Sequence, residues 1–143
     1  MAVPPITPFG VHHLAIQCRD LTSMVRFYQR VLRLPVERRW PSARPEDQGG
    51  DRSVWLRGGT SVIALERVDG EPAHPTWQSE QAGLHLLALE IAWQNRGIWL
   101  AHLAHCGVEV VFESAWTIYV RDPEGNRIGL SHFPFTAEGE RTA

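Results

Sequence analysis

The sequence predicts an α+β fold made of two copies of one strand-helix-strand-strand-strand unit. Two segments, 11–40 and 83–112, resemble each other at a constant offset of 72 positions. The match resumes at an offset of 65, where 62–65 aligns with 127–130. Neither copy could bury its apolar face alone, so the two copies must pack together. A chain of 143 residues, 43% of them hydrophobic, is long enough for one core and too short for two ordinary domains.

We therefore expect one domain over residues 9–133. Its two modules should span about 11–68 and about 84–133. Residues 134–143 are polar and follow the last predicted strand, so we expect them to form a poorly ordered tail.

The first module should begin with a strand at 13–18, a short apolar run that leads into a helical pattern. Asp20 or Thr22 can cap the helix by accepting a backbone N–H, and Pro35 cannot continue it. Three strands should follow at 36–40, 53–57 and 61–68. The helix presents one continuous apolar stripe, formed by Met24, Phe27, Tyr28, Val31 and Leu32.

The second module repeats this order. A strand is expected at 85–91, then a helix with Asn95 as its cap and Gly107 as its left-handed end. In the turn at 122–126, proline presets one dihedral and glycine accepts a positive one. The residues expected to pack the helix are Ile98, Trp99, Leu103 and Ala104, and the remaining strands are expected at 108–113, 117–121 and 126–133.

Several local features now point to a known group. His13 lies seven residues before Asp20, Gly83-Leu84-His85 opens the second half, and Tyr119 lies three residues before the turn at 122–126. Together with the order of elements, they make residues 11–133 resemble the vicinal oxygen chelate superfamily, which includes glyoxalases, bleomycin resistance proteins and extradiol dioxygenases. The resemblance implies two βαβββ modules whose sheets curl into one cupped, barrel-like cavity.

The resemblance also implies where a metal would be bound. In metal-binding members, the first and last strands of each half each provide one ligand, which here corresponds to His13, Ala64, His85 and Gly129. Alanine and glycine have no side-chain donor, and two neutral histidines hold a divalent ion only weakly. Glu66 shares a strand face with Ala64 and is the best substitute carboxylate. We expect no cofactor, or a weakly bound iron, manganese or zinc ion at His13, His85 and Glu66.

Each of these residues has an alternative, purely structural interpretation. His13 and His85 could be ordinary sheet histidines that hydrogen-bond to backbone or water. Glu66 lies near a strand end, where a solvated carboxylate is common.

Aromatic residues are the second feature of the predicted cavity. The repeat pairs Trp55 with Tyr119 and Trp40 with Phe112. Such residues are the usual material of a sheet core. They could instead line the cavity and stack on a planar ligand. Because Ala64 and Gly129 leave the cavity larger and less polar, a bulky, partly aromatic ligand is favoured over a small dicarbonyl compound.

Two hypotheses for function follow. The first is a small-molecule-binding protein with a degenerate metal site, in which the histidines could also do acid-base work. The second is a metal-dependent lyase, isomerase or dioxygenase that uses His13, His85 and a substitute ligand. The loops at 41–52 and 69–83 are expected to frame the opening in either case.

Composition restricts the partners. The formal net charge is −2 with no run of like charges, which argues against a nucleic-acid surface. Cys18 and Cys106 form no spacing motif and are expected to be free thiols. No segment has the length of a membrane span, and the N-terminus does not resemble a secretion signal. We expect a cytoplasmic protein, and the sequence leaves open a homodimer that pairs through edge strands.

Overall fold

The computed structural model of the chain describes residues 6–71 and 82–142. Most of the expected loop at 69–83 therefore lies outside the described residues. The first module contains a helix that continues as a π-helical turn over Phe27–Val31, and a 3-10 turn at Pro45–Asp47. Its other elements are β1 (His13–Cys18), α1 (Leu21–Arg26), β2 (Val36–Pro41), β3 (Asp51–Gly58) and β4 (Ser61–Arg67).

The second module has the same order of elements. Its elements are β5 (Leu87–Glu90), a 3-10 turn (Trp93–Asn95), α2 (Arg96–His105), β6 (Phe112–Glu113), β7 (Thr117–Arg121) and β8 (Arg127–Ser131). The strands pair in the order β1-β4-β3-β2 in one sheet and β5-β8-β7-β6 in the other. Two βαβββ modules of equal topology confirm the predicted fold.

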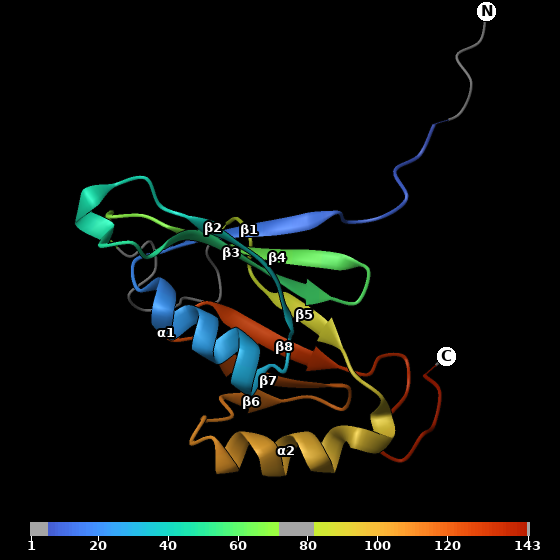
Figure 1. The fold of residues 1–143 in the computed structure, drawn as a ribbon. Coiled ribbons are helices and arrows are strands. Elements are labelled where there is room, and N and C mark those ends of the chain that lie inside the picture. The colour runs from blue at the N-terminus through green and yellow to red at the C-terminus, as the bar shows by residue number, and fades with distance from the viewer. Residues whose placement is uncertain (1–5, 72–81, 143) are drawn as a thin grey trace, which may run out of the picture.

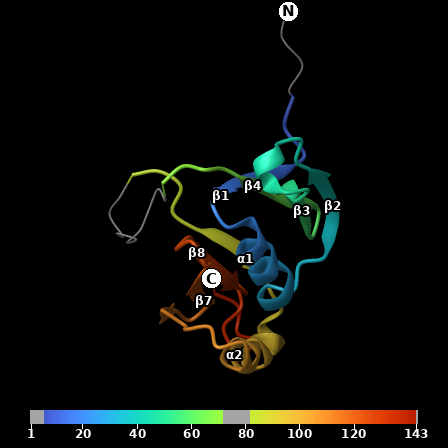
Figure 2. The same cartoon turned by 60° about the vertical axis from the view of Figure 1, so that its left-hand side comes forward.

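The two sheets and the two helices form a layered body (Figure 1). Helix α1 lies under the first sheet, and α2 lies at the opposite end of the molecule, next to the second sheet (Figures 1 and 2). One continuous core joins the modules. It includes Leu56 and Leu65 from the first sheet, Met24 from α1, Ile128 from the second sheet and Leu103 from α2.

Alternation along the strands assigns one face of each sheet to this core. In β1, Leu14 and Ile16 pack against the core, whereas His13, Ala15 and Gln17 are exposed on the other face. We call this other face, in both modules, the open face. Period-two geometry therefore keeps His13 on the face that the helices leave uncovered.

The register of the strands corrects the sequence alignment by one residue. Ala15 pairs with Ala64 in the first sheet, and Ala88 pairs with Gly129 in the second. The structural offset between β1 and β5 is therefore 73 rather than 72. A slip of one residue moves every side chain to the other face of a strand. His13 consequently corresponds to Leu86, and His85 corresponds to His12.

The remaining aromatic pairings also depend on register. Trp55 pairs with Ala64 and Tyr119 with Gly129, so the predicted equivalence of Trp55 and Tyr119 is confirmed. Arg38 is opposite Trp55, and Phe112 is opposite Tyr119. Phe112 thus corresponds to Arg38, and its predicted pairing with Trp40 is wrong. The β2–β3 register contains bulges, and a constant sequence offset between the two modules cannot show them.

The helix termini were predicted in part. Asp20 caps α1 by accepting from the backbone N–H of Ser23 at 3.0 Å, and Gly107 has the expected left-handed φ of 70°. Asn95 precedes α2 but makes no capping bond with its side chain. Ile98 is 68% exposed, so its expected packing is wrong, and the core contacts of α2 come from Trp99, Leu100 and Leu103.

The C-terminal segment is folded onto the second module, contrary to the expected loose tail. Phe135 and Arg141 form a β-bridge, and the Trp116 indole N–H donates to the Thr142 hydroxyl at 2.8 Å. Gly139 lies so close to Trp93 that a Cβ there would be 2.5 Å from the indole ring. Composition alone suggested a tail because the partners of these residues are distant in sequence.

Candidate functional site

The open face of the first sheet holds a row of rings and a guanidinium that come from three of its four strands. The imidazole of His13 on β1 is nearly parallel to the indole of Trp55 on β3, at 6.0 Å between centroids and 15° between planes. Trp55 meets Trp40 on β2 edge to face at 5.7 Å. The guanidinium of Arg38 lies 3.9 Å above the Trp40 ring. We call these four residues the aromatic platform.

The platform exists because the residue between its strands is small. Ala64 on β4 lies between Ala15 and Trp55 in the sheet, and it is covered by its neighbours. Alanine leaves room for His13 and Trp55 to approach each other across β4. A longer side chain at position 64 would stand between them.

Two polar atoms at the edge of the platform lack partners. The indole N–H of Trp40 and the hydroxyl of Ser53 are buried and make no hydrogen bond to any described residue. Trp40 and Ser53 are register partners on β2 and β3, so the two groups come from neighbouring positions. Unpaired buried polar groups are costly, and they cluster where a ligand or water completes them.

The open face of the second sheet holds a smaller aromatic cluster. Phe112 and Tyr119 contact each other at 5.7 Å between ring centroids. The Thr117 hydroxyl donates to that of Ser131 at 2.8 Å. A Cβ on Gly129 would be 3.0 Å from the Thr117 methyl and 3.5 Å from the Leu86 side chain. A side chain at position 129 would crowd Thr117, so close packing favours glycine there.

The positions that hold metal in relatives are almost devoid of donors here. With the corrected register they are His13, Ala64, Leu86 and Gly129, of which only His13 has a donor atom. A divalent metal in an enzyme needs about three protein ligands. The residues at these four positions therefore do not fit a catalytic metal ion.

His85, the second predicted ligand, is engaged elsewhere. Its Nε2 lies 2.9 Å from the Arg127 guanidinium, which can only donate, so this nitrogen accepts a hydrogen bond. The lone pair at Nε2 is thus directed at a cation that would repel a metal ion. His13 also has a close partner, because its Nδ1 lies 2.9 Å from the Nδ1 of His12.

The structure brings together two of the three predicted catalytic residues. Glu66 and His85 line the same groove of about 480 Å³ between the modules, together with Gln17 and Arg127. His13 lies outside this groove, on the platform. Among residues 6–71 and 82–142, no three His, Cys, Asp or Glu side chains form a group that could hold a metal ion.

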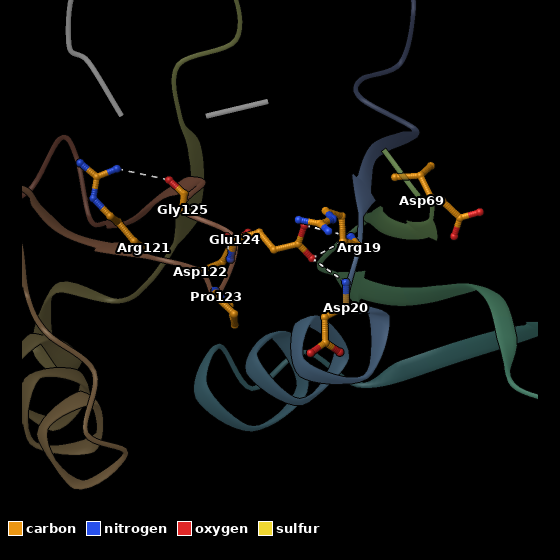
Figure 3. A pocket seen from close by; sticks show the side chains of 9 residues that line it. Arg19, Asp20, Asp69, Arg121, Asp122, Pro123, Glu124 and Gly125 are labelled. Atoms are coloured by element: carbon orange, nitrogen blue, oxygen red, sulfur yellow. Dashed lines mark hydrogen bonds between the residues drawn. The ribbon is translucent and has the colours of Figure 1, made fainter. Parts of the chain in front are cut away.

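A larger cavity of about 760 Å³ lies where the modules meet, at the turn between β7 and β8 (Figure 3). Glu124 points from this turn toward the start of α1, and its carboxylate accepts the backbone N–H groups of Arg19 and Asp20 at 2.9–3.0 Å. Arg121 donates to the carbonyl of Gly125 at 3.2 Å. Because these polar groups satisfy one another, the cavity is a structural joint between the modules.

Sequence reasoning missed Arg38, Leu86 and Arg127 as parts of the site. Arg38 follows from strand alternation with Trp40, a signal that was available in the sequence. Leu86 and Arg127 depend on the register of β5 against β8, which a continuous apolar run does not define.

Fold and site together define a class of protein that is built from two paired βαβββ modules, each with one open sheet face. A model of the Glyoxalase/Bleomycin resistance protein/Dioxygenase superfamily matches residues 10–130. The chain belongs to this superfamily, which is the vicinal oxygen chelate group. No curated protein matches its sequence.

Solved structures support the fold. A glyoxalase/dioxygenase from Nostoc punctiforme is 17% identical, with a TM-score of 0.70 over 90% of this chain and 97% of the other. A lactoylglutathione lyase from Agrobacterium tumefaciens is 18% identical, with a TM-score of 0.65 over 88% and 95%. A fosfomycin resistance protein from Listeria monocytogenes is 16% identical, with a TM-score of 0.64 over 88% and 93%. At these identities the likeness shows the fold alone.

Proposed function

We propose that this protein binds a bulky, partly aromatic small molecule on the aromatic platform and does so without a catalytic metal ion. The single observation that supports this most is the contiguous row of His13, Trp55, Trp40 and Arg38 on an open sheet face. Planar ligands gain energy by stacking on such rings. The unpaired groups of Trp40 and Ser53 could then meet polar atoms of the ligand.

Replacing Trp55 by alanine should raise the Kd for such a ligand at least about tenfold, since a central aromatic contact is worth roughly 2 kcal/mol or more. Trp55 is central because it contacts both His13 and Trp40. The wild-type ligand would be found by screening aromatic metabolites and antibiotics by thermal shift and tryptophan fluorescence. A ligand that binds only the folded state raises the melting temperature.

Trp99→Phe on α2 is the matched control, because it alters a tryptophan away from the platform. His13→Ala should weaken binding of the same ligand. His85 lies in the groove with Glu66, so His85→Ala should weaken binding only if the ligand extends between the modules. Equal affinity of wild type and Trp55→Ala for every hit would reject the platform as the binding site.

We expect that the purified protein, once incubated with iron, manganese or zinc and then dialysed, retains none of these ions in stoichiometric amount. The reason is the lack of donors at Ala64, Leu86 and Gly129, together with the hydrogen bond from Arg127 to His85. Elemental analysis measures the retained metal directly. A tightly held ion at one per chain would support the competing function, a metal-dependent lyase, isomerase or dioxygenase using His13, His85 and Glu66.

A second copy of this chain is the partner we propose for the apolar edge of the molecule. Val11 and Leu84 are 69% and 83% exposed and line a groove of about 830 Å³ beside the edge strands β1 and β5. Exposed edges next to apolar surface favour pairing between chains. Val11→Asp with Leu84→Asp should shift a dimer to monomer in analytical ultracentrifugation, whereas Ile98→Asp on α2 should not. A monomer at all wild-type concentrations would contradict this.

We also propose that the protein is cytoplasmic. No helix among the described residues is long and apolar enough to cross a membrane. Cys18 is buried and Cys106 is exposed, and the two are separate thiols in the structure. An exposed thiol is most compatible with a reducing compartment.

A further inference from the structure

Four arginines line a groove of about 270 Å³ on the helix side of the first sheet. The groove lies between α1 with its π-helical continuation and the strands β2, β3 and β4. Its apolar lining includes Leu21, Val25 and Val54, which are 7% exposed or less. The arginines are Arg26, Arg30, Arg39 and Arg67.

Negative charge in the lining is limited to one residue, Asp51. Its carboxylate binds the Arg39 guanidinium at 2.7 Å, and its backbone carbonyl accepts from the Arg67 Nε at 3.0 Å. Asp51 therefore orients two of the arginines. Among the described residues, no carboxylate lies within salt-bridge distance of Arg26 or Arg30.

The acids nearest to the groove already have partners. Asp20 caps α1 through Ser23, and this bond lowers its pKa more than the charges of Arg26 and Arg67 do. Asp47 is hydrogen-bonded to the hydroxyl of Ser42, which lowers its pKa in the same way. The groove is thus left with a surplus of positive charge.

Several guanidinium groups lining one groove suit an oxyanion. Arg26 and Arg30 are four residues apart, so they project from the same side of one helical segment. Arginine recognises phosphate and carboxylate through paired N–H groups, and it is easily desolvated against apolar surface. The apolar lining of the groove would strengthen these bonds by excluding water.

We propose that this groove is a second binding site that takes a small phosphorylated metabolite, with the phosphate held by Arg26, Arg30 and Arg39. The site is distinct from the aromatic platform, because Val54 lines the groove while the next residue, Trp55, faces the opposite side of the sheet. The volume is below that of a drug-sized pocket, so the ligand is small. The inference does not depend on what the platform binds.

The test is isothermal titration and thermal shift with inorganic phosphate, pyrophosphate and glycerol 3-phosphate at constant ionic strength. Wild type should bind at least one of them saturably, at about one per chain. Arg26→Gln with Arg30→Gln should raise its Kd at least about tenfold, since two charge-assisted hydrogen-bond donors to the phosphate are lost. The control is Arg52→Gln with Arg141→Gln, which removes equal charge outside the groove.

Three results would overturn the proposal. No saturable binding of any of the three anions by wild type would reject the site. An equal loss in the control pair would indicate general attraction to a charged surface rather than binding in the groove. Co-flotation with phosphatidic acid vesicles, without binding of the free anions, would assign the arginines to a lipid surface instead.

Discussion

Replacing Asp122 by alanine is expected to lower the free energy of unfolding by about 3 to 5 kcal/mol, since loss of a buried charged partner leaves its donors unpaired. Asp122 is 4% exposed and lies in the turn between β7 and β8. It accepts from the Tyr28 hydroxyl of the first module at 2.9 Å. It also accepts from the Asn126 side chain and from the backbone N–H groups of Glu124 and Asn126. Urea unfolding measures the effect.

Tyr28→Phe is the matched control for this prediction, because it removes only the hydrogen bond that Asp122 accepts from the first module. A loss of about 1 to 2 kcal/mol is expected there, smaller than for Asp122→Ala because the turn keeps its three other bonds. Equal stability of Asp122→Ala and wild type would show that the turn does not depend on this carboxylate.

The stability due to Asp122 should also depend on pH. Burial raises the pKa of Asp122 above the usual 3.8, although four hydrogen bonds oppose the shift. A folded-state pKa above the unfolded one means that the folded state binds the proton more tightly. Relative to Asp122→Asn, wild type should therefore be most favoured below pH 3.8 and lose part of this advantage as pH rises through the raised pKa. If the difference in free energy of unfolding between wild type and Asp122→Asn grew in favour of wild type as pH rises, the direction of the pKa shift would be contradicted.

A pair of substitutions on the second sheet should create metal affinity that the natural chain lacks. Leu86→His with Gly129→Glu places an imidazole and a carboxylate at the two ligand positions that the register assigns to this sheet. The Leu86 side chain already lies 3.5 Å from where the new Cβ at position 129 would stand. We expect zinc affinity to rise at least about tenfold, because two donors and one compensating charge are added.

The single variant Gly129→Glu distinguishes the two alignments of the repeat. If His85 were the true equivalent of His13, as the sequence offset predicts, Gly129→Glu alone would show the full gain in zinc affinity. With Leu86 in that position, it should show little. Titration of both variants with zinc, after circular dichroism confirms that each is folded despite the contact with Thr117, decides between them.

The sequence by itself determined the architecture and much of the first sheet's site. A repeat with fixed offsets and a period-two pattern depends only on local order, so the βαβββ modules, the Asp20 cap and the equivalence of Trp55 and Tyr119 were all predictable. The lack of a side-chain donor at Ala64 and Gly129 was also predictable, because it depends only on which residues occupy these positions.

Only the tertiary structure decided the site on the second sheet. The segment around Leu86 is a continuous apolar run, and such a run matches β1 almost equally well at offsets of 72 and 73, so pairing with β8 had to fix the register. Other features join residues far apart in the chain, such as Arg127 with His85 and Asp122 with Tyr28. Local pattern holds no information on such contacts, because they form only once distant parts of the chain have folded together.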